Sequence, residues 1–208
     1  SAGFPHSVNQ AVTTTALSST PNPPLVGQAV TFNATVSPSV ATGTVNFKDG
    51  AAVIGSATLA GGVATFATSS LPSGSRSITA EYLGSAGYAP STSHALVQQV
   101  TPNGNVVLRV VTTDGDERIR FSSPTPALSL TLATSGGQAQ SSPISLNPGS
   151  YRVTAALPDG FGLTSVTCSD ADSRGNVGNK AATIVLASSE VVTCTFAAAN
   201  SRRKTTRT

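Results

Sequence analysis

Short runs in which apolar and polar residues alternate, separated by glycine, proline, asparagine and aspartate, constrain the fold of this chain most strongly. In residues 29–36, every second position is apolar, with threonine or asparagine between: Val30, Phe32, Ala34 and Val36. Successive side chains of a β-strand point to opposite faces, so this spacing predicts a half-buried strand. The apolar spacing does not predict any helix longer than a turn or two.

The first half of the chain contains about seven such runs, a number and spacing that suit an antiparallel β-sandwich. Lys48, Asp49 and Gly50 predict a tight turn between two of them. The runs are residues 13–18, 29–36, the stretch around Val45 and Phe47, and then 52–59, 62–68, 75–83 and 95–100.

The second half has the same character. Alternation is clear at Val106, Leu108 and Val110 and again at Leu128, Leu130 and Leu132, and further strands are expected at 144–146, 150–155, 163–168, 182–187 and 191–197. A turn-rich stretch at 101–105 separates the halves. We therefore expect an all-β fold of two antiparallel β-sandwich domains in series. The expected parts are an N-terminal arm (1–11), a first domain (12–101), a second domain (105–199) and a basic C-terminal tail (200–208).

The charge distribution argues against a nucleic-acid-binding protein. The net charge is +3, and only 10% of the residues are charged. Residues 1–102 carry two positive and two negative side chains, 103–201 carry six and seven, and 202–208 carry four positive ones, so the body has a charge of −1. Nucleic-acid binders spread Lys and Arg over a folded face. No apolar run approaches the length of about 18 residues needed to cross a membrane, so we expect no membrane insertion.

The two cysteines, Cys168 and Cys194, indicate one disulfide in an oxidising compartment, with two buried free thiols as the alternative. Cys194 shares a strand face with Val192 and Phe196, and Cys168 follows Val166 by two residues. Both cysteines are therefore expected to point into the core, where a bridge could join two strands. A disulfide in an oxidising compartment favours an extracellular or cell-surface location.

Residues able to perform catalysis are scarce. His6 and His94 are the only histidines, and neither lies in a motif of a zinc site or a catalytic triad. We predict no catalytic residues, no enzymatic activity and no cofactor.

Two acidic segments are weak candidates for a metal site. Asp114, Asp116 and Glu117 could bind a hard cation if they converged, but a solvated hairpin turn is the preferred interpretation. The stretch 170–176 begins like a calcium loop, but it carries Arg174 where a third acidic residue would lie, so an ordinary glycine-rich loop is preferred there. We therefore predict no metal.

Residues 13–100 resemble the bacterial immunoglobulin-like domains that recur in tandem in exported surface proteins. The resemblance implies a scaffold or spacer module without catalytic residues. It rests on the segments 13–18, 21–23, 26–32 (VGQAVTF), 43–50 (GTVNFKDG), 62–66, 71–74, 78–82 (ITAEY) and 88–91.

Residues 105–198 are similar to the prealbumin-like β-sandwich domains of secreted bacterial proteins and adhesins. This resemblance implies a disulfide between the two cysteines. It rests on the segments 146–154 (LNPGSYRVT), 157–161 (LPDGF), 163–170 (LTSVTCSD) and 191–196 (VVTCTF).

These observations predict a structural subunit of an extracellular bacterial fibre or surface adhesin, whose partners are copies of itself or other surface proteins. The alternative is a carbohydrate-binding or spacer module of a larger secreted protein. Extended terminal segments could pair with the sheet edge of a neighbouring copy and build a polymer. The expected contacts are Phe4 and Val8 in the arm and Arg202, Arg203, Lys204 and Arg207 in the tail.

Overall fold

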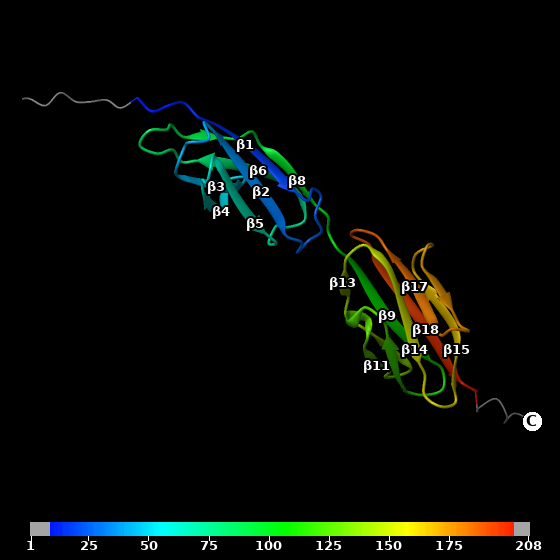
Figure 1. Cartoon of the computed structure of the whole chain (residues 1–208). Helices are drawn as coiled ribbons and strands as arrows, with labels where there is room; N and C mark the ends of the chain where they lie inside the picture. The colour runs from blue at the N-terminus through cyan, green and yellow to red at the C-terminus, as the bar shows by residue number, and fades with distance from the viewer. Residues whose placement is uncertain (1–8, 202–208) are drawn as a thin grey trace, which may run out of the picture. The chain divides into compact units, whose positions relative to one another are not determined.

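The computed structural model describes residues 9–201 (Figure 1), and the chain divides into two compact units, residues 1–102 and 103–208. Strands dominate both units, and one short 3-10 turn is the only helical element among the described residues. The two domains are described separately below.

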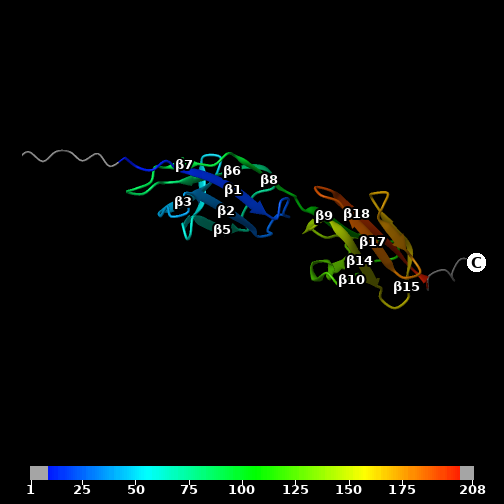
Figure 2. The same cartoon turned by 45° about the horizontal axis from the view of Figure 1, so that its top comes forward.

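The first domain contains eight strands in two sheets (Figure 2). One sheet has three strands in the order β1-β2-β5. The other has five strands: four lie in the order β4-β3-β6-β7, and β8 also pairs with β6. The bounds are β1 Thr14–Thr20, β2 Val30–Ser37, β3 Thr44–Asp49, β4 Ala52–Thr58, β5 Val63–Thr68, β6 Gly74–Tyr82, β7 Ser91–Thr92 and β8 Leu96–Val100.

Alternation produces the core of this domain. The four alternating apolar residues of β2 are at most 1% exposed, and they pack with aromatic residues of the facing sheet. The ring of Phe47 lies 6.3 Å from that of Phe32 and 5.4 Å from that of Phe66, between ring centroids. The predicted strands are therefore present, and β7 is an additional short one.

A two-residue turn directly precedes β5. Ala60 and Val63 exchange two backbone hydrogen bonds across Gly61 and Gly62. Both glycines have positive φ, 59° and 80°. A hairpin turn of this kind requires φ above zero at both positions, which glycine adopts without steric cost.

The second domain contains two five-stranded sheets, β11-β10-β14-β17-β16 and β12-β9-β18-β15 with β13 also paired to β9. The bounds are β9 Gly104–Thr112, β10 Arg118–Ser122, η1 Pro126–Leu128, β11 Thr131–Ala133, β12 Gln138–Gln140, β13 Ile144–Leu146, β14 Gly149–Ala156, β15 Phe161–Cys168, β16 Arg174–Asn176, β17 Ala181–Leu186 and β18 Val191–Asn200. The named pairs are antiparallel except β9 with β18, which run parallel over eight residue pairs. Parallel neighbours need a long connection, and nearly the whole domain lies between these two strands.

Two predictions for this domain are corrected by the structure. The alternation at Leu128, Leu130 and Leu132 is not one strand: Leu128 ends the 3-10 turn, and β11 begins only at Thr131. Pro126 favours this turn because its fixed φ suits the first position of a helical turn. All three leucines nevertheless belong to the core or pack against it. The stretch 170–176 is not wholly a loop, because it contains β16.

Candidate functional site

A disulfide joins Cys168 and Cys194 across neighbouring strands. Cys168 ends β15 and pairs directly with Cys194 in β18, with 4.1 Å between their Cα atoms. Cys194 is fully buried in the core, and Cys168 packs against the same core from a partly exposed position. The bridge therefore holds one end of the β15–β18 pair together.

The acidic segment at 114–117 connects β9 with β10, which belong to different sheets. It is therefore a crossing loop between the sheets, and the hairpin interpretation is wrong. The polar groups of this loop stabilise local structure: Asp114 Oδ2 accepts from the Asn200 N–H at 3.3 Å, and Asp116 Oδ1 accepts from the Gly137 N–H at 2.7 Å.

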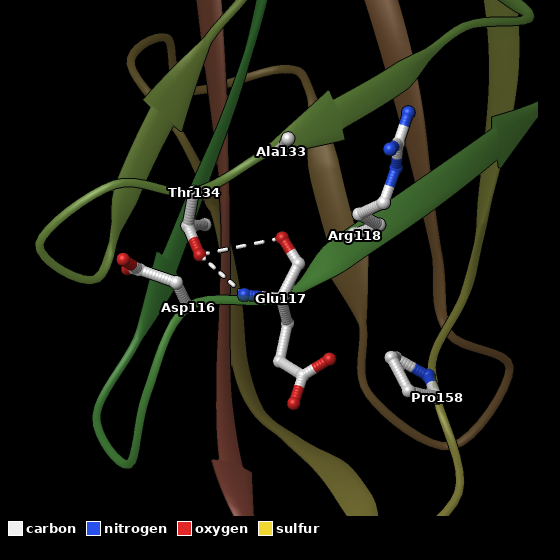
Figure 3. Close-up of a pocket in the computed structure, with 6 residues that line it drawn as sticks. All are labelled: Asp116, Glu117, Arg118, Ala133, Thr134 and Pro158. Atoms are coloured by element: carbon white, nitrogen blue, oxygen red, sulfur yellow. Dashed lines mark hydrogen bonds between the residues drawn. The ribbon is translucent and has the colours of Figure 1, made fainter.

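A shallow hollow of about 430 Å³ lies beside this loop (Figure 3). In Figure 3 the side chains of Asp116 and Glu117 point in different directions, and Thr134 Oγ1 bonds the backbone of Glu117. Within the described residues, the one group of three carboxylates that converges does not include Asp114, Asp116 or Glu117. The hollow is lined by Asp116, Glu117, Arg118, Ala133, Thr134 and Pro158.

Three other carboxylates do converge. Within residues 9–201, the side-chain oxygens of Asp170, Asp172 and Glu190 lie within 4.8 Å of one another. Such oxygens suit a hard cation such as Ca²⁺. Two of the three also serve the local fold: Asp170 Oδ2 accepts from the Ser173 N–H at 3.0 Å, and Glu190 Oε2 accepts from the Ala187 N–H at 2.7 Å. The sequence interpretation considered Asp170 and Asp172 together but missed Glu190.

The proximity of these carboxylates changes their proton affinities. A hydrogen bond with Asp170 raises the pKa of Asp172, and the charges of Asp170 and Glu190 raise it further. Desolvation acts to raise the pKa of Asp170, but hydrogen bonds from Asp172 and Ser173 outweigh it, and the net shift is downward. Of the two aspartates, Asp172 is thus the one that takes up a proton first as the pH falls.

A second hollow, of about 660 Å³, lies in the first domain where the edges of β4 and β5 approach each other. None of its lining residues is charged. They are Thr44, Ser56, Ala57, Thr58, Ala60, Val63 and Thr65.

The predicted polymer contacts Phe4, Val8, Arg202, Arg203, Lys204 and Arg207 lie outside the described residues, as does His6. The described chain begins beside the loop before β7, where the Ala11 N–H donates to Gly87 O and the Gln10 side chain donates to Ser85 O. His94 is exposed between β7 and β8.

The two cores and their strand orders define the chain as a tandem of two β-sandwich domains. Comparison with protein families specifies them further. Residues 17–101 match the family model of the bacterial Ig-like domain (group 3), and residues 106–200 match that of the prealbumin-like fold domain. The chain thus consists of a bacterial Ig-like domain followed by a prealbumin-like domain, in the order expected from the sequence.

Several solved structures are similar to the chain at low identity. The chain is 13% identical to the Bacillus anthracis TIE protein (TM-score 0.34), and the match covers 89% of this chain but only 40% of that one. Fibronectin(III)-like modules of Clostridium thermocellum CbhA are 13% identical (TM-score 0.34, 92% and 98% covered), and the major pilin of Streptococcus pyogenes is 11% identical (TM-score 0.31, 92% and 99% covered). At these TM-scores the likenesses support no argument about function. No curated protein sequence matches the chain.

Proposed function

We propose that the chain is a non-enzymatic structural subunit of an extracellular bacterial fibre or surface adhesin. The observation that carries this proposal is the pair of domain families, since bacterial Ig-like and prealbumin-like domains are typically structural and non-enzymatic. Each domain has its own apolar core, as a mechanical or spacing module requires.

Two features support an extracellular location. The disulfide between Cys168 and Cys194 persists best in an oxidising compartment outside the cytosol. Both families also occur in bacterial surface proteins. Among residues 9–201, no helix has the length and apolar character needed to span a membrane.

We further propose that the subunit assembles by strand exchange. A terminal segment of one copy would pair with an open sheet edge of the next, contributed through Phe4 and Val8 or through the basic residues of the tail. A contact of this head-to-tail kind does not close on itself and yields a fibre. Its partner is therefore a second copy of the chain.

The experiment is sedimentation and negative-stain electron microscopy of the purified chain over a range of concentrations, with variants that lack residues 1–11 or 202–208. Concentration-dependent filaments that disappear with one truncation are expected. An intact chain that remains monomeric at high concentration, or truncated chains that both assemble normally, would contradict assembly by strand exchange.

The carbohydrate-binding alternative gains no specific support. Sugar sites commonly offer exposed aromatic platforms, but Tyr82 is fully buried and donates its hydroxyl to Thr42 O, and the Tyr151 hydroxyl donates to Asn147 O. A glycan array tests this alternative: strong selective binding would favour it over the fibre subunit.

A further inference from the structure

The outer edge of β5 lacks the features that usually protect a sheet edge. Natural edges are blunted by charged side chains, proline, bulges or covering loops. β5 contains no charged residue or proline, and its register with β2 runs without a shift from Val30↔Thr68 to Thr35↔Val63. None of the three strands of this sheet contains a charged residue.

The other edges of the same domain are treated differently. At the β1 edge, the Thr13 and Thr15 hydroxyls bond to Ser91 Oγ. At the β8 edge, the Asn22 side chain donates to Val97 O and accepts from the Gln99 N–H. β4 is irregular, because its register with β3 shifts between Phe47 and Lys48. Among the described residues, β5 is therefore the edge strand that combines an unshifted register with an outer edge free of such side-chain hydrogen bonds.

The backbone groups that β5 presents outward follow from its ladder. The Val36 N–H donates to Gly62 O, so residues 64, 66 and 68 also direct their backbone groups toward β2. Val63, Thr65 and Ala67 direct theirs to the open side. Val63 uses its own pair for Ala60, whereas the N–H and C=O groups of Thr65 and Ala67 make no backbone hydrogen bond on this side within the described part of the chain.

The hollow beside this edge has the chemistry of a strand-binding groove. Directly after β4, the Leu59 N–H donates to Gly43 O, so every second residue back from Leu59 directs its backbone groups toward β3. Ser56 and Thr58 therefore direct theirs outward. Ser56, Thr58 and Thr65 all line the hollow of about 660 Å³. An extended segment in this space would meet unpaired peptide groups and no charged side chain.

Charge selects the occupant among the chain's own terminal segments. Residues 1–8 contain no Asp, Glu, Lys or Arg, whereas residues 202–208 carry four positive side chains. Placing the basic segment against an uncharged groove would leave these charges without partners. Residues 1–8 are therefore the better match.

The alternation in residues 1–8 also fixes the direction of pairing. In an extended strand, Phe4, His6 and Val8 share one face, with Pro5 and Ser7 on the other. Pro5 has no N–H, so its nitrogen must point away from β5.

Parallel pairing directs the Pro5 nitrogen away from β5 and also turns Phe4 and Val8 inward. If Pro5 lies opposite Thr65 and Ser7 opposite Ala67, the Thr65 and Ala67 N–H groups donate to the carbonyls of Phe4 and His6. Their C=O groups accept from the N–H groups of His6 and Val8. Phe4 and Val8 then point inward on the same face as Phe66. Antiparallel pairing would instead either require the missing N–H of Pro5 or turn Phe4 and Val8 outward.

The geometry points to β5 as a strand acceptor that takes residues 1–8 of a second copy as a parallel edge strand. This inference rests on the proposed function, because self-assembly requires the segment to come from a neighbour.

The test is disulfide trapping between two full-length single-cysteine variants, Ser7→Cys and Ala67→Cys, mixed in equal amounts with the native disulfide intact. We expect a cross-linked heterodimer in a yield about tenfold above that of two controls. One control replaces Ala67→Cys by Val97→Cys on the β8 edge, and the other replaces Ser7→Cys by Thr205→Cys in the tail. Equal yields in all mixtures, or no cross-link, would overturn the inference.

A second pair of variants tests the backbone pairing itself. Ala67→Pro removes an outward N–H without touching the β2 ladder, and Ala67→Ser keeps that N–H. We expect Ala67→Pro to weaken self-association by about tenfold and Ala67→Ser to leave it unchanged, with equal thermal stability in both. Equal self-association of the two variants would contradict the pairing.

The outcomes separate this inference from the proposed function. Filaments without the trapped pair would leave the fibre subunit standing and refute β5 as the acceptor. A specific trapped dimer without filaments would support the acceptor and refute the polymer. A cross-link that forms only when both substitutions are in one chain would mean that the segment fills its own domain, which also overturns the inference.

Discussion

Reduction of the disulfide should destabilise the second domain selectively. The bridge closes a loop with a sequence separation of 26 residues. In the chain-entropy model, closing a loop of this length removes about 12 cal/mol/K from the unfolded state, or about 3.5 kcal/mol at 25 °C. For a domain of about 100 residues, whose unfolding entropy is about 0.2 kcal/mol/K, this corresponds to a decrease of about 17 °C in Tm.

The assay is thermal unfolding of the intact chain with and without a reducing agent, followed by NMR signals assigned to each domain. The first domain contains no cysteine and serves as the internal control. Comparing the reduced chain with the double variant Cys168→Ala/Cys194→Ala separates the cross-link from packing, because Cys194 is fully buried and its removal leaves a small cavity. A change in Tm below about 3 °C for the second domain, or an equal change in both, would refute the reasoning.

Two further substitutions test individual contacts. Tyr82→Phe should cost about 1 kcal/mol in the free energy of unfolding of the first domain, measured by urea denaturation, because Thr42 O loses the hydroxyl that bonds it at 2.7 Å; an unchanged value would mean that this bond contributes nothing. Asp172→Asn should raise the Tm of the second domain at neutral pH. The folded state raises the pKa of Asp172, so the stability that its protonated form contributes below the ordinary pKa near 3.8 is lost as the pH rises through the raised pKa. The neutral amide of asparagine does not undergo this loss. A variant whose Tm has the same pH profile as that of the wild type would contradict the assignment.

Strand positions were predictable wherever burial alternates along several residues. β2 is the clearest case, because its inward residues are all apolar and its outward ones all polar. The short strands β12 and β16 have three residues each, too few for a period of two to stand out from a loop. β10 alternates Ile119 and Phe121 with polar neighbours, so its signal was present in the sequence and was missed.

The pairing of the first with the last strand of the second domain could not be predicted from the local sequence pattern. The parallel pairing of β9 with β18 joins the first and last strands of the second domain, and nothing in either sequence specifies a partner so far along the chain. The failure of the 114–117 hairpin has the same origin. An Asp-Gly turn fits both a hairpin and a crossing loop, and only the packing of the two sheets decides which forms.

The acidic cluster shows how one long-range pairing makes other contacts predictable. Cys168 pairs with Cys194, and the same antiparallel register continues one residue further, where the Ser169 N–H donates to Thr193 O and the Thr193 N–H donates to the Ser169 hydroxyl. Moving two residues outward on each side from Cys168 and Cys194 gives Asp170 and Val192, and moving four gives Asp172 and Glu190. Extending the register in this way would set Asp172 opposite Glu190, and their carboxylates do lie within 4.8 Å of each other, although their separation in sequence conceals it. Asp114, Asp116 and Glu117 have no such long-range constraint, and their proximity in sequence did not make them converge. For this chain, register across a cross-linked strand pair was a better guide to where carboxylates gather than their spacing along the sequence.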